Sequence, residues 1–331
     1  MIIRTHAYAR AGLIGNPSDG YFGKTISLIL KDFRTDVVLF ESPELIIEPD
    51  ERDISRFSSI RDLIQDVRLH GYYGGVRLIK AAIRRFGDYC YHNGIHLEDR
   101  NFTIRYSTNI PRLVGLAGSS AIVTACMRGL MEFFSVEIPL PVLPNLILAV
   151  EREELGIEAG LQDRVIQVYE GCIYMDFGRE VMERQGFGIY ERLDPSLLPP
   201  LYIAYDVTGA EGSERVHNRL RARFEAGEPK VVNAMKEFAE LAVRTRQMLV
   251  DGRGREIAPL MNRNFDIRSS ICTISRENVQ MIQAARSAGA SSKFAGSGGA
   301  IIWTYVDEDM YRRLEARMNE IGCKIFRPQI V

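Results

Sequence analysis

Short runs rich in Val, Ile and Leu alternate along the chain with longer segments in which apolar residues recur every three or four positions. The runs predict β-strands at residues 27–30, 35–41, 45–47, 102–106, 172–177, 201–205, 300–305 and 323–326. The periodic segments predict helices at residues 59–69, 76–93, 120–134, 143–155, 161–169, 213–226, 230–249, 278–288 and 308–321. Because the two kinds of element are mixed without regular β-α-β alternation, the pattern indicates an α+β fold.

One stretch, residues 178–200, has no clear hydrophobic period and ends in Asp194-Pro195 and Pro199-Pro200. Pairs of this kind mark turns and connections. With 331 residues, the chain is long enough for two domains that each bury a core. We therefore expect an N-terminal domain at residues 1–195, a crossing connection, and a C-terminal domain at residues 196–331.

Composition narrows the class of protein. The chain is 46% hydrophobic and 26% charged, with a net charge of −1 and no dense basic run. That argues against nucleic acid or an anionic membrane as the main partner. No apolar stretch is long enough for a signal peptide or a membrane span. The five cysteines are scattered without C-x-x-C spacing, so we expect reduced thiols in a cytoplasmic protein, either a monomer or a homodimer.

The strongest local signal is a run rich in Gly and Ser at residues 109–121, between the predicted strand 102–106 and the predicted helix 120–134. Its two serines fall where a helix N-cap is expected. A glycine-rich turn that leads into a helix offers free N–H groups at the positive end of the helix dipole, which suits a phosphate group. The predicted phosphate-binding residues are Pro111, Gly115, Leu116, Ala117, Gly118, Ser119 and Ser120.

Two companion segments, residues 9–24 and 293–300, are also rich in glycine. Taken in their order along the chain (9–24, 109–121 and 293–300), the three segments resemble the three motifs of the GHMP kinases, the family of galactokinase, homoserine kinase and mevalonate kinase. The middle motif departs from the family pattern by one extra residue, in Gly-Leu-Ala-Gly-Ser-Ser-Ala. The resemblance implies a two-domain GHMP kinase fold, with an N-terminal domain like ribosomal protein S5 domain 2 and a ferredoxin-like C-terminal domain. It also implies ATP and Mg²⁺ as cofactors.

Asp163 lies on a face of the predicted helix 161–169 that we expect to be partly buried. A buried carboxylate needs either a partner or a function. By the resemblance, Asp163 is the catalytic aspartate, and Arg10 is the basic residue of the first motif, close to it. The resemblance further implies that Ser120 and Glu151 bind Mg²⁺, with Glu153 and Glu154 as alternatives to Glu151.

Six further segments, which start at residues 16, 21, 71, 160, 198 and 264, resemble the members of the family that phosphorylate the anomeric hydroxyl of D-glucuronate. The implied product is glucuronate 1-phosphate, a precursor of UDP-glucuronate. The implied sugar-binding residues are Asn16, Asp19, Arg268, Gly298 and Gly299. Arg268 is the first candidate for the uronate carboxylate, with Arg77 and Arg164 as alternatives.

Three alternatives stay open at this point. Galacturonate and a heptose phosphate are alternatives to glucuronate as the sugar, because the Gly-x-Gln-Asp run also resembles heptose-phosphate kinases. The third alternative is a GHMP-fold binding protein without catalysis, although the presence of Arg10, Ser120, Glu151 and Asp163 argues against that interpretation.

Overall fold

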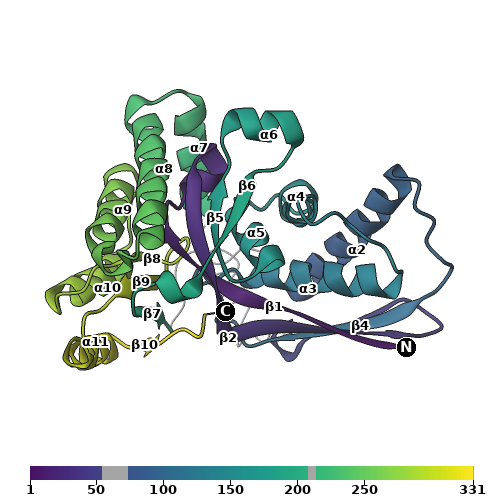
Figure 1. Ribbon diagram of the computed structural model, residues 1–331. Helices are drawn as coiled ribbons and strands as arrows, with labels where there is room; N and C mark the ends of the chain where they lie inside the picture. Colours follow the sequence, from purple (N-terminus) through teal and green to yellow (C-terminus); the bar gives the residue numbers. More distant parts are fainter. Residues whose placement is uncertain (54–73, 208–213, 331) are drawn as a thin grey trace, which may run out of the picture.

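The computed structural model describes residues 1–53, 74–207 and 214–330, and of residues 52 and 214–219 the backbone alone. The predicted helix at 59–69 and residues 71–73 of one quoted segment lie outside these ranges. Two antiparallel-rich sheets, each covered by helices, lie side by side in the molecule (Figure 1). The α+β class expected from the sequence is confirmed.

The first sheet is dominated by one long hairpin. β1 (Ile2–Ile14) runs antiparallel to β2 (Lys24–Glu41) along almost its whole length. β1 buries every second residue in its first half, as expected for a strand that covers a core. The other strands give the order β3 (Ile46–Glu48), β4 (Phe102–Thr108), β2, β5 (Cys172–Asp176) and β6 (Ile189–Leu193).

The sequence pattern missed β1 and divided β2 into two strands. The register between β1 and β2 shifts between Tyr8 and Ala9, at the polar stretch of β2 near residues 31–34. That irregularity interrupts the alternation without ending the strand. The connection predicted at 178–200 is also wrong in part, because it contains the helix α6 (Arg179–Gln185) and the strand β6.

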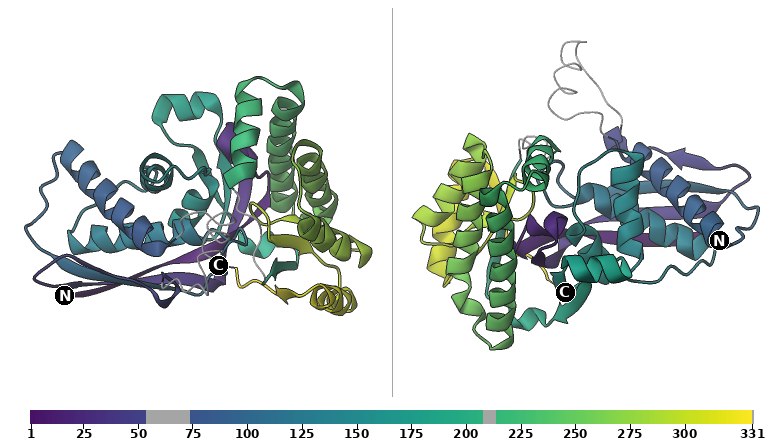
Figure 2. Two further views of the ribbon diagram at one scale, coloured as in Figure 1. Left: turned by 180° about the vertical axis from the view of Figure 1, so that it is seen from behind. Right: turned by 90° about the horizontal axis from the view of Figure 1, so that it is seen from above.

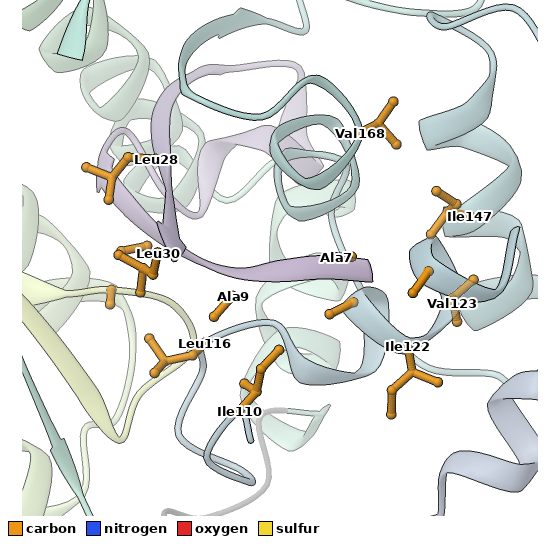
Figure 3. Packing of buried hydrophobic residues seen from close by; sticks show 14 of the residues in the cluster. Ala7, Ala9, Leu28, Leu30, Ile110, Leu116, Ile122, Val123, Ile147 and Val168 are labelled. Atoms are coloured by element: carbon orange, nitrogen blue, oxygen red, sulfur yellow. The ribbon is translucent and has the colours of Figure 1, made fainter. Parts of the chain in front are cut away.

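Helices α2 (Gly75–His92), α3 (Gly118–Phe133), α4 (Leu143–Ala149) and α5 (Gln162–Tyr169) cover one face of the first sheet (Figure 2). α3 packs on β1 and β2, and its other side is covered by α2, α4 and α5. It is therefore buried on nearly every face, which explains its almost continuous apolar sequence. Ile122 and Val123 of α3 share an apolar cluster with Ala7, Ala9 and Leu116 (Figure 3).

The second sheet has the order β10 (Cys323–Phe326), β7 (Leu201–Asp206), β9 (Ala300–Thr304) and β8 (Lys293–Phe294), with antiparallel pairing throughout. A second apolar cluster joins this sheet to α9 (Ala258–Ile271), α10 (Arg276–Ser287) and α11 (Glu308–Glu320). α9 was not predicted, because its apolar residues are interrupted by polar ones that turn out to bond inside the protein.

Two more helices, α7 (Glu214–Glu225) and α8 (Pro229–Val250), follow β7 in the chain and pack against each other. α8 packs against α9 and also against β2 and the short 3-10 turn η1 (Ser18–Tyr21). The chain changes sheets between β6 and β7, and the domain division at 195/196 stays a prediction. Of the helices in the described ranges, none is both long and apolar enough to span a bilayer.

The burial of α3 leads to a stability prediction. Leu130 lies in the C-terminal half of α3 and is fully buried, so we expect Leu130→Ala to lower the free energy of unfolding by about 2–5 kcal/mol through lost contacts and a cavity. Urea denaturation followed by circular dichroism measures this. Val243→Ala on α8, where the side chain is 43% exposed, is the control and should change stability by less than about 0.5 kcal/mol. Equal effects of the two variants would contradict the packing described here.

Candidate active site

Arg10 is the residue on which four segments converge. It lies on β1 and is almost fully buried. Its Nε and Nη2 atoms donate to Oδ1 and Oδ2 of Asp163 at 2.6 and 2.8 Å. Its Nη1 atom donates to the carbonyl oxygens of Gly115 at 2.7 Å and Ala295 at 3.0 Å. One guanidinium group thus joins the first motif to the phosphate loop, the third motif and α5.

The backbone strengthens the same junction. The Arg10 amide donates to the carbonyl of Leu116 at 3.2 Å, and the Gly12 amide donates to the carbonyl of Ala295 at 2.7 Å. A Cβ on Gly296 would overlap the carbonyl oxygen of Gly115, and one on Gly115 would lie 2.7 Å from the carbonyl oxygen of Gly298. The glycines are therefore required for close approach of the two loops, and Gly115 also has a φ of +70°.

The predicted phosphate loop leads into α3, as expected, but the serines are not its N-cap. α3 begins at Gly118, and Ala117 is the N-cap residue with a left-handed φ of +63° and no side-chain cap. Ser119 and Ser120 lie inside the first turn. A first turn without a side-chain cap leaves its N–H groups for another acceptor, which is the arrangement that binds phosphate at helix starts. The left-handed Ala117 is a strained position, and such positions occur at ligand-binding loops.

Glu151 and Ser119 meet beside this loop. α4 continues into a π-helical turn at Val150–Glu154, which carries Glu151 into the interior, where it is fully buried. Ser119 Oγ donates to Glu151 Oε1 at 2.8 Å, and Arg164 donates to Oε2 through Nε at 2.8 Å and through Nη2. The Ser120 hydroxyl instead donates to the Ala117 carbonyl at 3.2 Å. The structure therefore pairs Glu151 with Ser119, a contact that the sequence analysis did not identify.

The two alternatives to Glu151 point to a different place. Glu153 forms an ion pair with Arg85, and Glu154 forms one with Arg84 at 3.0 Å. Both arginines belong to α2, so these carboxylates tie the π-helical turn to that helix. Of the three predicted carboxylates, Glu151 is the one in contact with the phosphate loop.

Asp19 lies close to Asp163, although it comes from the turn η1. Its Oδ2 accepts a hydrogen bond from the Gln162 amide at 3.2 Å, and a Cβ on Gly160 would overlap the same oxygen. Burial, together with the negative charge of Asp163, raises the pKa of Asp19 from 3.8 to about 7. Two carboxylates that disfavour each other's charge are typical of a functional site and not of a structural one.

Asn16 and the third motif are held together by buried polar groups. Asn16 Nδ2 donates to the Phe294 carbonyl at 3.5 Å, and Asn264 bonds both the Gly15 amide and the Asn16 carbonyl. Lys293 is a residue that the prediction passed over: its ammonium donates to the carbonyls of Gly12 and Phe294, each at 2.6 Å. Burial lowers the pKa of Lys293 well below its usual value, and Arg268 and Arg10 lower it further. Its position as the first residue of the third motif was the available signal.

Gly298 and Gly299 close this side of the site. The Gly299 amide donates to Asn278 Oδ1 on α10 at 2.8 Å, and its carbonyl accepts from the Asp206 amide at 2.9 Å. Gly298 has a φ of +150°, in the region that favours glycine. The loop is therefore fixed to the second sheet on one side and to Gly115 on the other.

Arg268 does not have the surroundings expected of a carboxylate ligand. It is 3% exposed, and its Nη1 and Nη2 atoms donate to the carbonyls of Gly296 at 2.9 Å and Ser297 at 2.8 Å. Its guanidinium carbon lies 5.1 Å from the centre of the Phe294 ring. Arg268 thus stabilises the backbone of the third loop. Of the two other candidates for the uronate carboxylate, Arg164 forms an ion pair with Glu151, and Arg77 lies in the first turn of α2.

Comparison with known proteins places the chain in a family. The family model described as GHMP kinases N terminal domain matches residues 77–171. Glucuronokinase 1 of Arabidopsis thaliana is 44% identical over 306 residues, which cover 91% of this chain and 84% of that protein. The D-glycero-alpha-D-manno-heptose 7-phosphate kinase of Campylobacter jejuni is 21% identical, over 97% of this chain and 94% of that protein.

The fold agrees with solved structures of such enzymes. Lactococcus lactis galactokinase, complexed with galactose, superposes with a TM-score of 0.79 at 15% identity, over 99% of this chain and 93% of that chain. The family model and the 44% identity to glucuronokinase 1, together with this fold, define an ATP-binding phosphotransferase. The chain belongs to the GHMP kinase family, and it is a glucuronokinase-like member of that family.

The raised pKa of Asp19 predicts that replacing this residue with Asn stabilises the protein, and that the gain depends on pH. The folded protein holds the Asp19 proton more tightly than the unfolded chain, so folding becomes less favourable as the pH rises from about 4 to about 7. Asn carries no charge and keeps the acceptor oxygen. We therefore expect Asp19→Asn to raise Tm at pH 8 by roughly 2–5 °C, with a smaller gain at pH 5.

Thermal melts at both pH values measure the effect. Asp251→Asn, at an exposed position after α8, is the matched control and should leave Tm unchanged at either pH. A loss of stability in Asp19→Asn, or a gain that is the same at both pH values, would contradict the electrostatic description of this pair.

Proposed function

We propose that this kinase transfers the γ-phosphoryl group of ATP to the anomeric hydroxyl of D-glucuronate, forming glucuronate 1-phosphate and ADP. The observation that carries the proposal is the bidentate Arg10–Asp163 pair beside the uncapped first turn of α3. This pair provides a proton acceptor next to a phosphate site. The 44% identity to glucuronokinases over most of the chain supports the choice of sugar.

In this proposal Asp163 orients the sugar hydroxyl and accepts its proton as the oxygen attacks the γ-phosphorus. The Asp163 side chain is 17% exposed, so a substrate can reach it, whereas Arg10 behind it is 5% exposed. Arg10 holds the carboxylate by both oxygens and fixes its direction. Its positive charge also lies where it offsets charge that develops on the transferred group.

The phosphate groups of ATP would lie against the first turn of α3, with Gly115 to Ser120 as their cradle. Pro111 and Leu116 shape this loop, since Leu116 is buried in the core. The third loop, with Gly298 and Gly299, would cover the phosphates and the sugar from the opposite side. Asn16 and Asp19 would lie beside the sugar, where they would form hydrogen bonds with its hydroxyl groups.

The residues beside the loop fit a magnesium ion. Glu151 is a carboxylate, and Ser119 and Ser120 are hydroxyls, so the set consists of hard oxygen donors. Mg²⁺ usually takes one or two such ligands from the protein and the rest from phosphates and water. When bound, it would neutralise charge on the phosphates. Arg164, which now neutralises the buried Glu151, would be released in part from that carboxylate.

A sugar panel tests the proposal. The protein is incubated with Mg-ATP and glucuronate, galacturonate, glucose, galactose or a heptose 7-phosphate, and ADP release and phosphorus NMR are recorded. ADP release with glucuronate and a new anomeric phosphate signal is the expected result. A preference for galacturonate or the heptose phosphate would reassign the substrate and keep the mechanism. No turnover of any sugar would favour a non-catalytic binding protein.

The role of Asp163 gives a separate prediction. Asp163→Asn keeps the shape of the side chain but removes the base, so we expect kcat to fall by about 10²–10⁴-fold with KM for ATP little changed. Asp251→Asn makes the same change at an exposed site and should have wild-type kcat. Steady-state ADP release measures both. Near-normal kcat in Asp163→Asn would mean that Asp163 only supports Arg10.

A further inference from the structure

The proposed substrate carries a carboxylate that needs a cation, and most cations of the site are already occupied. Arg10 binds Asp163 and two carbonyls, and Arg164 binds Glu151 and the Gly160 carbonyl. Arg268 binds two carbonyls of the third loop. Lys293, at 1% exposure, is enclosed by backbone oxygens. None of these four can turn to a sugar without breaking a buried contact.

Arg221 on α7 differs from those residues. Its side chain is 26% exposed, and its Nε donates to Glu158 Oε2 at 3.1 Å. Among the described residues, the terminal nitrogens have only a loose contact, 3.8 Å from Nη1 to the largely exposed Glu225. Glu158 therefore holds the guanidinium by its inner edge and leaves the Nη1–Nη2 edge for a ligand. That edge is the fork that binds a carboxylate bidentately.

The position of Arg221 places it at the sugar side of the site. Its guanidinium carbon lies 5.5 Å from the centre of the Tyr21 ring, and a Cβ on Gly20 would lie 3.7 Å from its Nη2. Gly20 and Tyr21 directly follow Asp19 in the turn η1. Glu158 lies two residues before Gly160, which packs against Asp19. In Figure 1, α7 lies beside the purple end of the first hairpin, where this turn is found.

Electrostatics around Tyr21 support the same neighbourhood. Burial raises the pKa of Tyr21 to about 12, the charge of Arg221 opposes this shift, and Asp19 and Glu158 add to it. The phenol thus lies within range of all three charged groups. Asp19, Tyr21, Arg221 and Glu158 form one rim, and Asp163 lies behind it, next to Asp19.

The chemistry of a uronate fits this rim. Its anomeric hydroxyl and its carboxylate are attached to the two ring carbons that flank the ring oxygen, so they leave the ring on opposite sides of that oxygen. A sugar with its anomeric hydroxyl at Asp163 and ring hydroxyls at Asp19 therefore extends toward η1 and α7. We propose that Arg221 binds the uronate carboxylate through Nη1 and Nη2 and so selects uronates over neutral sugars. This inference rests on the proposed function.

The test compares D-glucuronate with D-glucuronamide, in which an amide replaces the carboxylate at the same size. We expect the wild type to prefer glucuronate in kcat/KM. In Arg221→Gln that preference should shrink by about 10–100-fold, the scale of lost charge-assisted hydrogen bonds. The change should appear in KM for glucuronate, with KM for ATP and use of glucuronamide nearly unchanged.

Two further variants make the result specific. Arg221→Lys keeps the charge without the fork and should recover part of the preference. Arg223→Gln removes an arginine from the same helix, where it is paired with Glu228, and should retain the wild-type preference. Circular dichroism and Tm confirm that each variant is folded.

The outcomes separate the two proposals. If the wild type uses glucuronate and Arg221→Gln keeps the full preference, the assignment of Arg221 is wrong and the proposed function stands. If Arg221→Gln loses both substrates equally, the residue is structural and the assignment also fails. If the wild type does not phosphorylate glucuronate, the proposed function itself fails, and the assignment of Arg221 fails with it.

Discussion

The site depends on one ion pair, between the buried Arg10 and the partly exposed Asp163. Arg10 and Asp163 share two hydrogen bonds, and the remaining nitrogen of Arg10 fixes Gly115 and Ala295. Removing one partner of such a pair leaves an uncompensated charge inside the protein, which typically costs about 3–5 kcal/mol. The first sheet, the phosphate loop, α5 and the third motif meet at this point. The distance between the proposed phosphate site and the proposed proton acceptor is therefore set by a single side chain.

Around this pair, the protein tolerates features that do not favour stability. Asp19 is held close to Asp163, Glu151 and Arg164 are both buried, and Lys293 carries its amine among carbonyls. Ala117 has a left-handed backbone. Unfavourable charges and strained residues concentrate where a ligand has to be held, because the ligand supplies the missing partners. The rest of the core, centred on α3 and the second apolar cluster, provides the stability that permits this arrangement.

The sequence predicted much of the fold, and the structure brings most of the predicted site residues together, but their contacts with one another were less predictable. Periodicity located α3, α5 and most strands, and the three glycine-rich motifs identified the family. It missed α9 because polar residues such as Asn264 and Arg268 point inward to bond with distant backbone atoms. Those partners lie far away in the sequence, so no local pattern reports them. For the same reason the sequence did not predict the contact of Ser119 with Glu151, nor the bonds of Arg268 to two carbonyls of the third loop.

A double-mutant cycle tests most directly whether Arg10 and Asp163 act as one unit. Arg10→Met, Asp163→Asn and the double variant are compared with the wild type in kcat/KM for glucuronate, after circular dichroism shows that each is folded. If the pair is one unit, the double variant should be no more than about tenfold worse than the worse single variant, because the second change removes nothing further. If the loss of kcat/KM in the double variant equals the product of the two single losses, as for independent residues, Arg10 and Asp163 do not act as one unit.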